Sequence, residues 1–181
     1  MIEAKWAGFK EAFHGFDPVM LCFQPDDYWE ALTADTRIVR NGQKIQSVRA
    51  NAYFVRDVAS EHGGFGKFLA EWPADDQVGL LELLAKRGSR LGGATGQYLL
   101  RFLGRDGFTT SGDVVRALRD AGLDIAENPI SKRDQAKIQA QFNIWAAETG
   151  LHYAQLSRTC AMSIGENYTT ERLLAMGGRE E

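Results

Sequence analysis

Hydrophobic residues recur at helical spacing along most of the chain, and this pattern predicts helices joined by short loops. Near the start, Trp6, Phe9 and Phe13 lie three and four positions apart, so we expect a helix over residues 2–14 that buries this aromatic face. A second stripe predicts a helix of roughly 18 residues that ends at Gly63-Gly64. The stripe consists of Ile45, Val48, Ala52, Val55 and Ala59. Because no strand-like alternation persists anywhere, the pattern predicts an all-α fold.

Prolines, glycines and capping residues predict where the other helices begin and end. Short helices are expected after Asp17-Pro18, after Pro25 and over residues 65–72, where Pro73 stops the last of them. A long helix is expected from Ser131 to Gly150, with Ile138, Phe142 and Trp145 facing the core. A final helix is expected to carry Leu156, Cys160 and Ile164 on one face.

A glycine-rich turn at Gly92-Gly93-Ala94-Thr95-Gly96 separates two apolar helical runs, expected over Asp75–Ala85 and Gly93–Leu103. Glycines permit a positive φ and leave backbone N–H groups uncovered, and the second helix adds the positive end of its dipole at the same place. The basic residues around the turn are Lys86, Arg87, Arg90, Arg101 and Arg105. This arrangement suits a clamp for a phosphate backbone. A sharp structural turn with solvated cations fits the spacing equally well.

Composition and charge narrow the class of protein. The 181 residues carry a net charge of −3, and we expect one domain over residues 1–165 followed by a flexible tail at 166–181. Cations concentrate at Arg37–Arg56 and Lys86–Arg105, so one basic face is compatible with the acidic total. No apolar run is long enough to cross a membrane. The N-terminus lacks a secretory signal, and we expect a cytoplasmic protein.

The residues that commonly bind metals or catalyse reactions are sparse. Cys22 and Cys160 lie far apart, so free thiols are expected rather than a disulfide or a metal site. We expect no metal and no cofactor. Asp113 follows Thr109-Thr110-Ser111-Gly112 and precedes an expected helix over residues 114–118. It is a candidate functional carboxylate, although an N-cap is an equally plausible role at that position.

Within this context the turn segment, KRGSRLGGATGQYLLRFLG, resembles the helix-hairpin-helix of the DNA-3-methyladenine glycosylase I family. Upstream, WAGFKEAFHGFDP is similar to that family's aromatic helix followed by F-D-P, and DTRIVRNGQKIQSVRANA is similar to its I-[IV]-R-[NH]-x-x-K-I-x-[AS] helix. Downstream, the segment from Ser131 to Gly165 looks like the tail of a related bacterial subgroup. The resemblance covers roughly residues 6–165.

The resemblance implies an all-α, helix-hairpin-helix DNA glycosylase-like bundle that acts in base excision repair. Such enzymes flip an alkylated adenine out of duplex DNA and hydrolyse its N-glycosidic bond. It implies a monomer whose partner is duplex DNA with alkylated bases, and no membrane. In the wider superfamily of helix-hairpin-helix glycosylases, an aspartate after the hairpin stabilises the sugar or positions water, and Asp113 stands at about that place, so it is our candidate for the sugar-facing catalytic carboxylate. The methyladenine family itself dispenses with this aspartate and relies on a pocket carboxylate, so a helix cap stays the alternative for Asp113. The residues assigned to DNA binding are Gly92, Gly93, Gly96, Ala94, Thr95, Lys86, Arg87 and Arg90.

The resemblance also has departures. Family members carry a further N-terminal segment, with a glutamate and a tryptophan of the base pocket and half of a zinc site, and none of these residues has a counterpart here. We therefore expect a complete DNA clamp and an incomplete base pocket, either in a shortened homologue or in a chain whose start codon is misassigned. The aromatic residues Trp6, Tyr28 and Tyr98 could line a pocket, although core packing is expected for each. A DNA-binding module without glycosylase activity is the alternative, and a protein-interaction domain is a weaker one.

Overall fold

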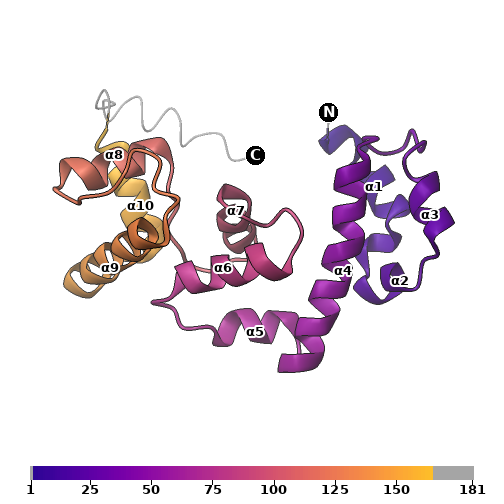
Figure 1. The fold of residues 1–181 in the computed structure, drawn as a ribbon, viewed down its shortest axis with the longest axis horizontal. Coiled ribbons are helices and arrows are strands. Elements are labelled where there is room, and N and C mark those ends of the chain that lie inside the picture. Colours follow the sequence, from indigo (N-terminus) through magenta and orange to yellow (C-terminus); the bar gives the residue numbers. More distant parts are fainter. Residues whose placement is uncertain (1, 165–181) are drawn as a thin grey trace. The chain divides into compact units, whose positions relative to one another are not determined.

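A computed structural model describes residues 2–164 as helices joined by short loops (Figure 1). The helices are α1 (Trp6–Ala12), α2 (Pro18–Cys22), α3 (Asp26–Ala31), α4 (Gly42–His62), α5 (Phe65–Glu71), α6 (Gln77–Arg87), α7 (Ala94–Phe102), α8 (Gly112–Asp120), α9 (Lys132–Thr149) and α10 (Tyr153–Met162). Short 3-10 turns at Glu3–Lys5 and His14–Phe16 flank α1. No strand occurs within the described range, so the all-α prediction is confirmed.

The expected domain of residues 1–165 contains two compact units. The first comprises the chain up to Pro73 together with Gly79–Gly96, and the second comprises Ala74–Val78 together with the chain from Gln97 onward. The first unit thus holds α1–α5 and the turn between α6 and α7, whereas α8–α10 belong to the second. The tail expected at 166–181 lies outside the described residues.

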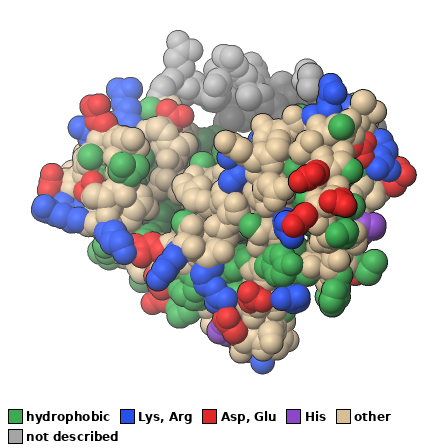
Figure 2. Space-filling model, turned by 45° about the vertical axis from the view of Figure 1, so that its right-hand side comes forward, with side chains coloured by type: hydrophobic (Ala, Val, Ile, Leu, Met, Phe, Trp, Pro, Cys, Tyr) green, Lys and Arg blue, Asp and Glu red, His purple; other side chains and the backbone are tan. Residues whose placement is uncertain are grey.

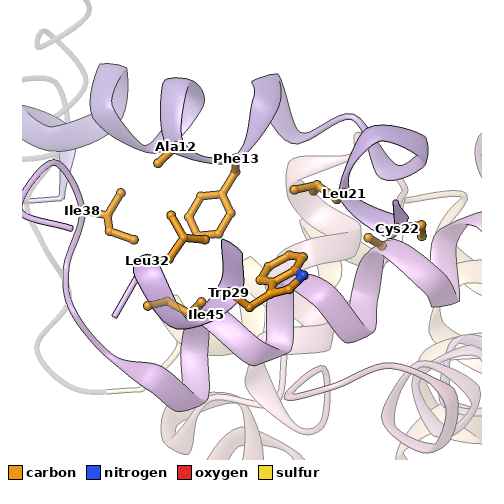
Figure 3. Close-up of a cluster of buried hydrophobic side chains, with 9 residues drawn as sticks. Ala12, Phe13, Leu21, Cys22, Trp29, Leu32, Ile38 and Ile45 are labelled. Atoms are coloured by element: carbon orange, nitrogen blue, oxygen red, sulfur yellow. The ribbon is translucent and has the colours of Figure 1, made fainter. Parts of the chain in front are cut away.

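The core of the first unit gathers side chains from α1, α2, α3 and the start of α4 (Figure 3). Phe13 and Trp29 are almost fully buried, with ring centroids 6.5 Å apart, and Leu32, Ile38 and Ile45 pack around them. Each such side chain contributes about 1.5–3 kcal/mol when it is fully buried. This core fixes the start of α4 against α2 and α3.

The aromatic N-terminal helix is shorter and less buried than the sequence predicts. It ends at Ala12 because His14, Gly15 and Phe16 adopt positive φ values of 50°, 65° and 62°, which a helix cannot continue through. Phe13 is buried as expected, but Trp6 is 48% exposed. The Trp6 ring stacks on the Phe16 ring, with their centroids 5.6 Å apart. The expectation that Trp6 packs into the core is therefore wrong.

Helix α4 is the longest helix of the described chain, and it ends where predicted, although its 21 residues exceed the expected length. The Asn41 side chain accepts a hydrogen bond from the Lys44 N–H at its start, and Gly63, with φ of 73°, closes its C-terminus. The predicted apolar stripe is only partly correct, since the fully buried residues of α4 are Ile45, Ala52, Phe54 and Val58. Helix α4 packs on α2 and also on α5, so its buried face shifts along its length, with Phe54 edge-to-face on Phe65 of α5.

The second unit has its own core, where α8, α9 and α10 meet. Phe108 and Phe142 stack with centroids 4.4 Å apart, beside Val114, Leu118 and Ile138. Helix α9 begins and ends as predicted, with Ser131 accepting from the Asp134 N–H at 3.1 Å and Gly150 in the left-handed region. The final helix ends at Met162, so the expectation that Ile164 belongs to it is wrong.

Candidate nucleic-acid interface

Helices α6 and α7 are joined by a six-residue turn, residues 88–93, whose backbone reverses sharply. Two residues of the turn have positive φ, Arg90 at 60° and Gly93 at 57°. At Gly93 a side chain would meet no heavy atom within 4 Å, so the position is open as well as left-handed. The positive φ expected of a glycine at this turn is thus confirmed at Gly93, while the left-handed Arg90 was not anticipated.

The turn is held against α4 by hydrogen bonds within the first unit. The Asn51 side chain accepts from the Ser89 N–H at 2.7 Å and donates to the Ser89 carbonyl at 3.0 Å. The next residue, Arg90, donates from Nη1 to Gln43 Oε1 at 3.4 Å. Because both backbone groups of Ser89 are satisfied by one amide, α4 fixes the conformation of the turn. This partnership joins residues 38 positions apart.

The exposed part of the turn runs from Gly92 to Thr95, where α7 begins. The first amides of a helix have no carbonyl partner within the helix, so those of Ala94 and Thr95 are available to an anion. Gly96 differs from its neighbours because it is buried. A Cβ there would lie 2.6 Å from the Leu91 carbonyl oxygen and 2.9 Å from Leu81 Cδ2. A glycine at this position therefore permits the close packing of α6, α7 and the turn, and the expectation that Gly96 helps to hold a DNA phosphate stays a prediction.

The three cations next to the turn are not equivalent. Lys86 and Arg90 are exposed, and neither forms an ion pair with an acidic residue of the described chain. Arg87 instead makes a bidentate salt bridge with Glu61 of α4, at 2.6 and 2.7 Å. The hydrogen bonds from Arg87 hold the pKa of the Glu61 carboxyl below its usual value. The Arg87 charge is thus paired within the protein, and its assignment to DNA binding stays a prediction.

A shallow hollow of about 750 Å³ lies between α4 and the turn, and we call it the α4–hairpin groove. All of its lining belongs to the first unit. The lining residues are Lys44, Ser47, Val48, Asn51, Ser89, Arg90, Leu91, Gly92 and Thr95. Of this set, the sequence pointed to Arg90, Gly92 and Thr95 of the turn. It left Lys44 open, either as a solvated cation off the apolar stripe or as a side chain that braces a loop or touches phosphate.

Asp113 lies in the first turn of α8, in the second unit, and is exposed. The N-cap is Ser111, whose hydroxyl accepts from the Val114 N–H at 3.5 Å, so the alternative that Asp113 caps this helix is wrong. The segment before α8 is fixed to Gln97 of α7 by two hydrogen bonds. Gln97 Nε2 donates to Thr110 Oγ1 at 2.8 Å, and the Thr110 N–H donates to Gln97 Oε1 at 3.0 Å. The Asp113 carboxylate therefore does not cap α8, and it is accessible to solvent or to a ligand at the start of this helix.

Other chemically reactive groups are few. No cluster of three metal-binding side chains occurs among residues 2–164. Cys22 and Cys160 are free, as predicted, and burial raises the pKa of both thiols.

Tyr98 is 51% exposed rather than packed in the core, whereas Tyr28 is half-buried and donates to the Ala12 carbonyl. On the face drawn in Figure 2, basic and acidic side chains are interspersed.

Comparison with known proteins adds an independent finding. The family model described as methyladenine glycosylase matches residues 1–116, which include α1–α7, the α4–hairpin groove and the first half of α8 with Asp113. No curated protein and no solved structure gave a significant match. None of the helices in the described range is both long and apolar enough to traverse a lipid bilayer. Because the match spans more than half of its 181 residues, this chain belongs to the methyladenine glycosylase family.

Proposed function

We propose that the chain is a DNA glycosylase of base excision repair that releases 3-methyladenine from duplex DNA. The observation that carries the proposal is the family match over residues 1–116, which contains both the exposed turn and Asp113. The structure supports it with an open, positively flanked turn at the start of a nine-residue helix. Lys86 and Arg90 supply attraction to the backbone, and salt should weaken that attraction.

In this proposal the turn holds one phosphate of the DNA backbone. The amides of Ala94 and Thr95 donate to its oxygens, and the N-terminal end of α7 contributes a partial positive charge. Gly93 has no side chain in the open space beside the turn, so the phosphate can approach the backbone closely. Phosphate contacts of this kind fix the register of the protein on the duplex without reading sequence.

The reaction requires little further chemistry from the protein. Methylation at N3 makes the adenine cationic, so that cleavage of the bond to C1′ releases a neutral base and leaves positive charge on the sugar. The flipped nucleotide brings this centre into the protein. We assign to the Asp113 carboxylate the stabilisation of the oxocarbenium-like sugar or the positioning of water. Water then adds to C1′ and loses a proton.

The test is release of free base from methylated duplex DNA by the wild-type chain and by Asp113→Asn. We expect wild type to release 3-methyladenine, and the variant to be slower by a factor of about 10²–10⁴, the range typical of a positioned acid or base. Asp120→Asn, an exposed aspartate at the other end of α8, is the control and should retain full activity. Release that survives in Asp113→Asn would remove Asp113 from the chemistry. DNA binding without release by wild type would favour the alternative, a DNA-binding module.

A further inference from the structure

We propose that the α4–hairpin groove binds a second backbone phosphate, adjacent to the one at the turn, with Lys44 as its principal contact. The inference rests on the DNA-binding part of the proposed function and extends the interface from the turn onto α4. It assigns a role to a residue that belongs to neither the turn nor the catalytic helix.

The charges of the groove favour an anionic occupant. Lys44 and Arg90 both line it, and no Asp or Glu of the described chain is part of its lining. Arg90 is tethered to Gln43, a neutral side chain, so its guanidinium keeps its full charge while it is held near the first turn of α4. Two uncompensated cations at one hollow repel each other, and a phosphate placed between them would relieve that repulsion.

The hydrogen-bonding groups of the groove point to the same occupant. Thr95 is exposed, and its hydroxyl makes no hydrogen bond within the described chain, so it is free to donate to a phosphate oxygen. Ser47 is not available as a donor, because its hydroxyl donates to the Lys44 carbonyl at 2.7 Å. Asn51 is held in place by its two hydrogen bonds with Ser89. The groove therefore presents donors from Lys44, Arg90 and Thr95.

The position of the groove selects a neighbouring phosphate of the DNA backbone over an unrelated anion. Gly92 and Thr95 belong both to the groove and to the exposed turn, so the two sites are continuous. Val48 and Leu91 supply apolar lining, against which the sugar of the intervening nucleotide can pack. A strand held at the turn would accordingly continue across the groove toward α4.

The experiment measures the affinity of the full chain for a labelled duplex over a range of salt, by fluorescence anisotropy. Each phosphate contact that is lost should reduce the slope of log Kd against log salt by about 0.9. We expect Lys44→Gln to show this reduction together with several-fold weaker binding at low salt, and Lys44→Arg to restore both. Lys10→Gln, which removes an exposed lysine of α1 in the same unit, should match wild type.

The outcomes separate this inference from the proposed function. If Gly93→Glu weakens binding while Lys44→Gln leaves affinity and slope unchanged, the groove is not part of the interface, although DNA binding at the turn stands. If Lys10→Gln reduces the slope as much as Lys44→Gln, the effect is one of net charge, and the assignment of Lys44 is overturned. If the wild-type chain does not bind duplex DNA, the inference and the proposed function both fail.

Discussion

At the scale of single residues, Gly93 and Gly96 show that two glycines of one turn serve different physical purposes. Gly93 has a positive φ and open space around it, so it is required by backbone conformation and by access to the turn. Gly96 has no positive φ, and it is required because α7 passes so close to the Leu91 carbonyl that no Cβ fits. The glycine-rich motif therefore combines one glycine required by backbone conformation with one required by packing.

Gly96→Ala should destabilise the protein. The added Cβ would lie 2.6 Å from backbone at Leu91, and relieving such overpacking costs about 1–3 kcal/mol, more than the helix propensity that alanine restores. Gly66→Ala is the matched control, since Gly66 is also helical, lies in the same unit and has open space around it. Thermal unfolding should show a lower Tm for Gly96→Ala alone. Equal Tm values for the two variants would mean that α7 can shift without cost.

At the scale of elements, α4 holds the turn between α6 and α7 although it lies far from the turn in sequence. It contributes Asn51, which satisfies both backbone groups of Ser89, and Glu61, which pairs with Arg87. The same helix lines the α4–hairpin groove through Lys44. The conformation of the turn is thus set by its packing partner as much as by its own glycines.

Asn51→Ala should loosen the turn and weaken DNA binding. Two hydrogen bonds to Ser89 would be lost, and its part-buried backbone groups would be left unsatisfied. This loss should lower the stability of the turn by about 1–3 kcal/mol. Gln46→Ala, which removes an exposed side chain of the same helix, is the control. Duplex affinity measured below the Tm of both variants should fall only for Asn51→Ala. Equal affinities would indicate that the turn keeps its binding conformation without this anchor.

Local signals in the sequence predicted most element boundaries, because caps and glycines act within a few residues. Gly63 at the end of α4, and Ser131 and Gly150 at the two ends of α9, hold the expected positions, whereas the Asn41 cap of α4 was not anticipated. Features that depend on packing partners were not predictable in this way. Arg87 and Glu61 are 26 positions apart, so the sequence did not reveal their salt bridge. Arg87 was therefore predicted to be a free cation beside the turn, whereas it is paired.

At the scale of the whole molecule, the family match and the folding units have different boundaries. The match ends at residue 116, in the middle of α8. The buried side of α8, with Val114 and Leu118, packs in a core that Ile138 and Phe142 of α9 complete. Helices beyond the match are therefore needed to bury the helix that carries Asp113, and a chain ended at residue 116 would expose that core.

The most direct test of this account is single-turnover release of 3-methyladenine from methylated duplex DNA, at subsaturating concentrations of wild type, Gly93→Glu and Gly150→Glu. The two variants add the same charge and the same left-handed strain, with φ of 57° and 70°, but Gly150 lies at the end of α9, outside the family match. We predict release by wild type and Gly150→Glu, and release at least about tenfold slower for Gly93→Glu, which corresponds to 1.4 kcal/mol of lost binding. Absence of release by wild type, or equal rates for the two variants, would contradict a glycosylase that holds DNA at this turn.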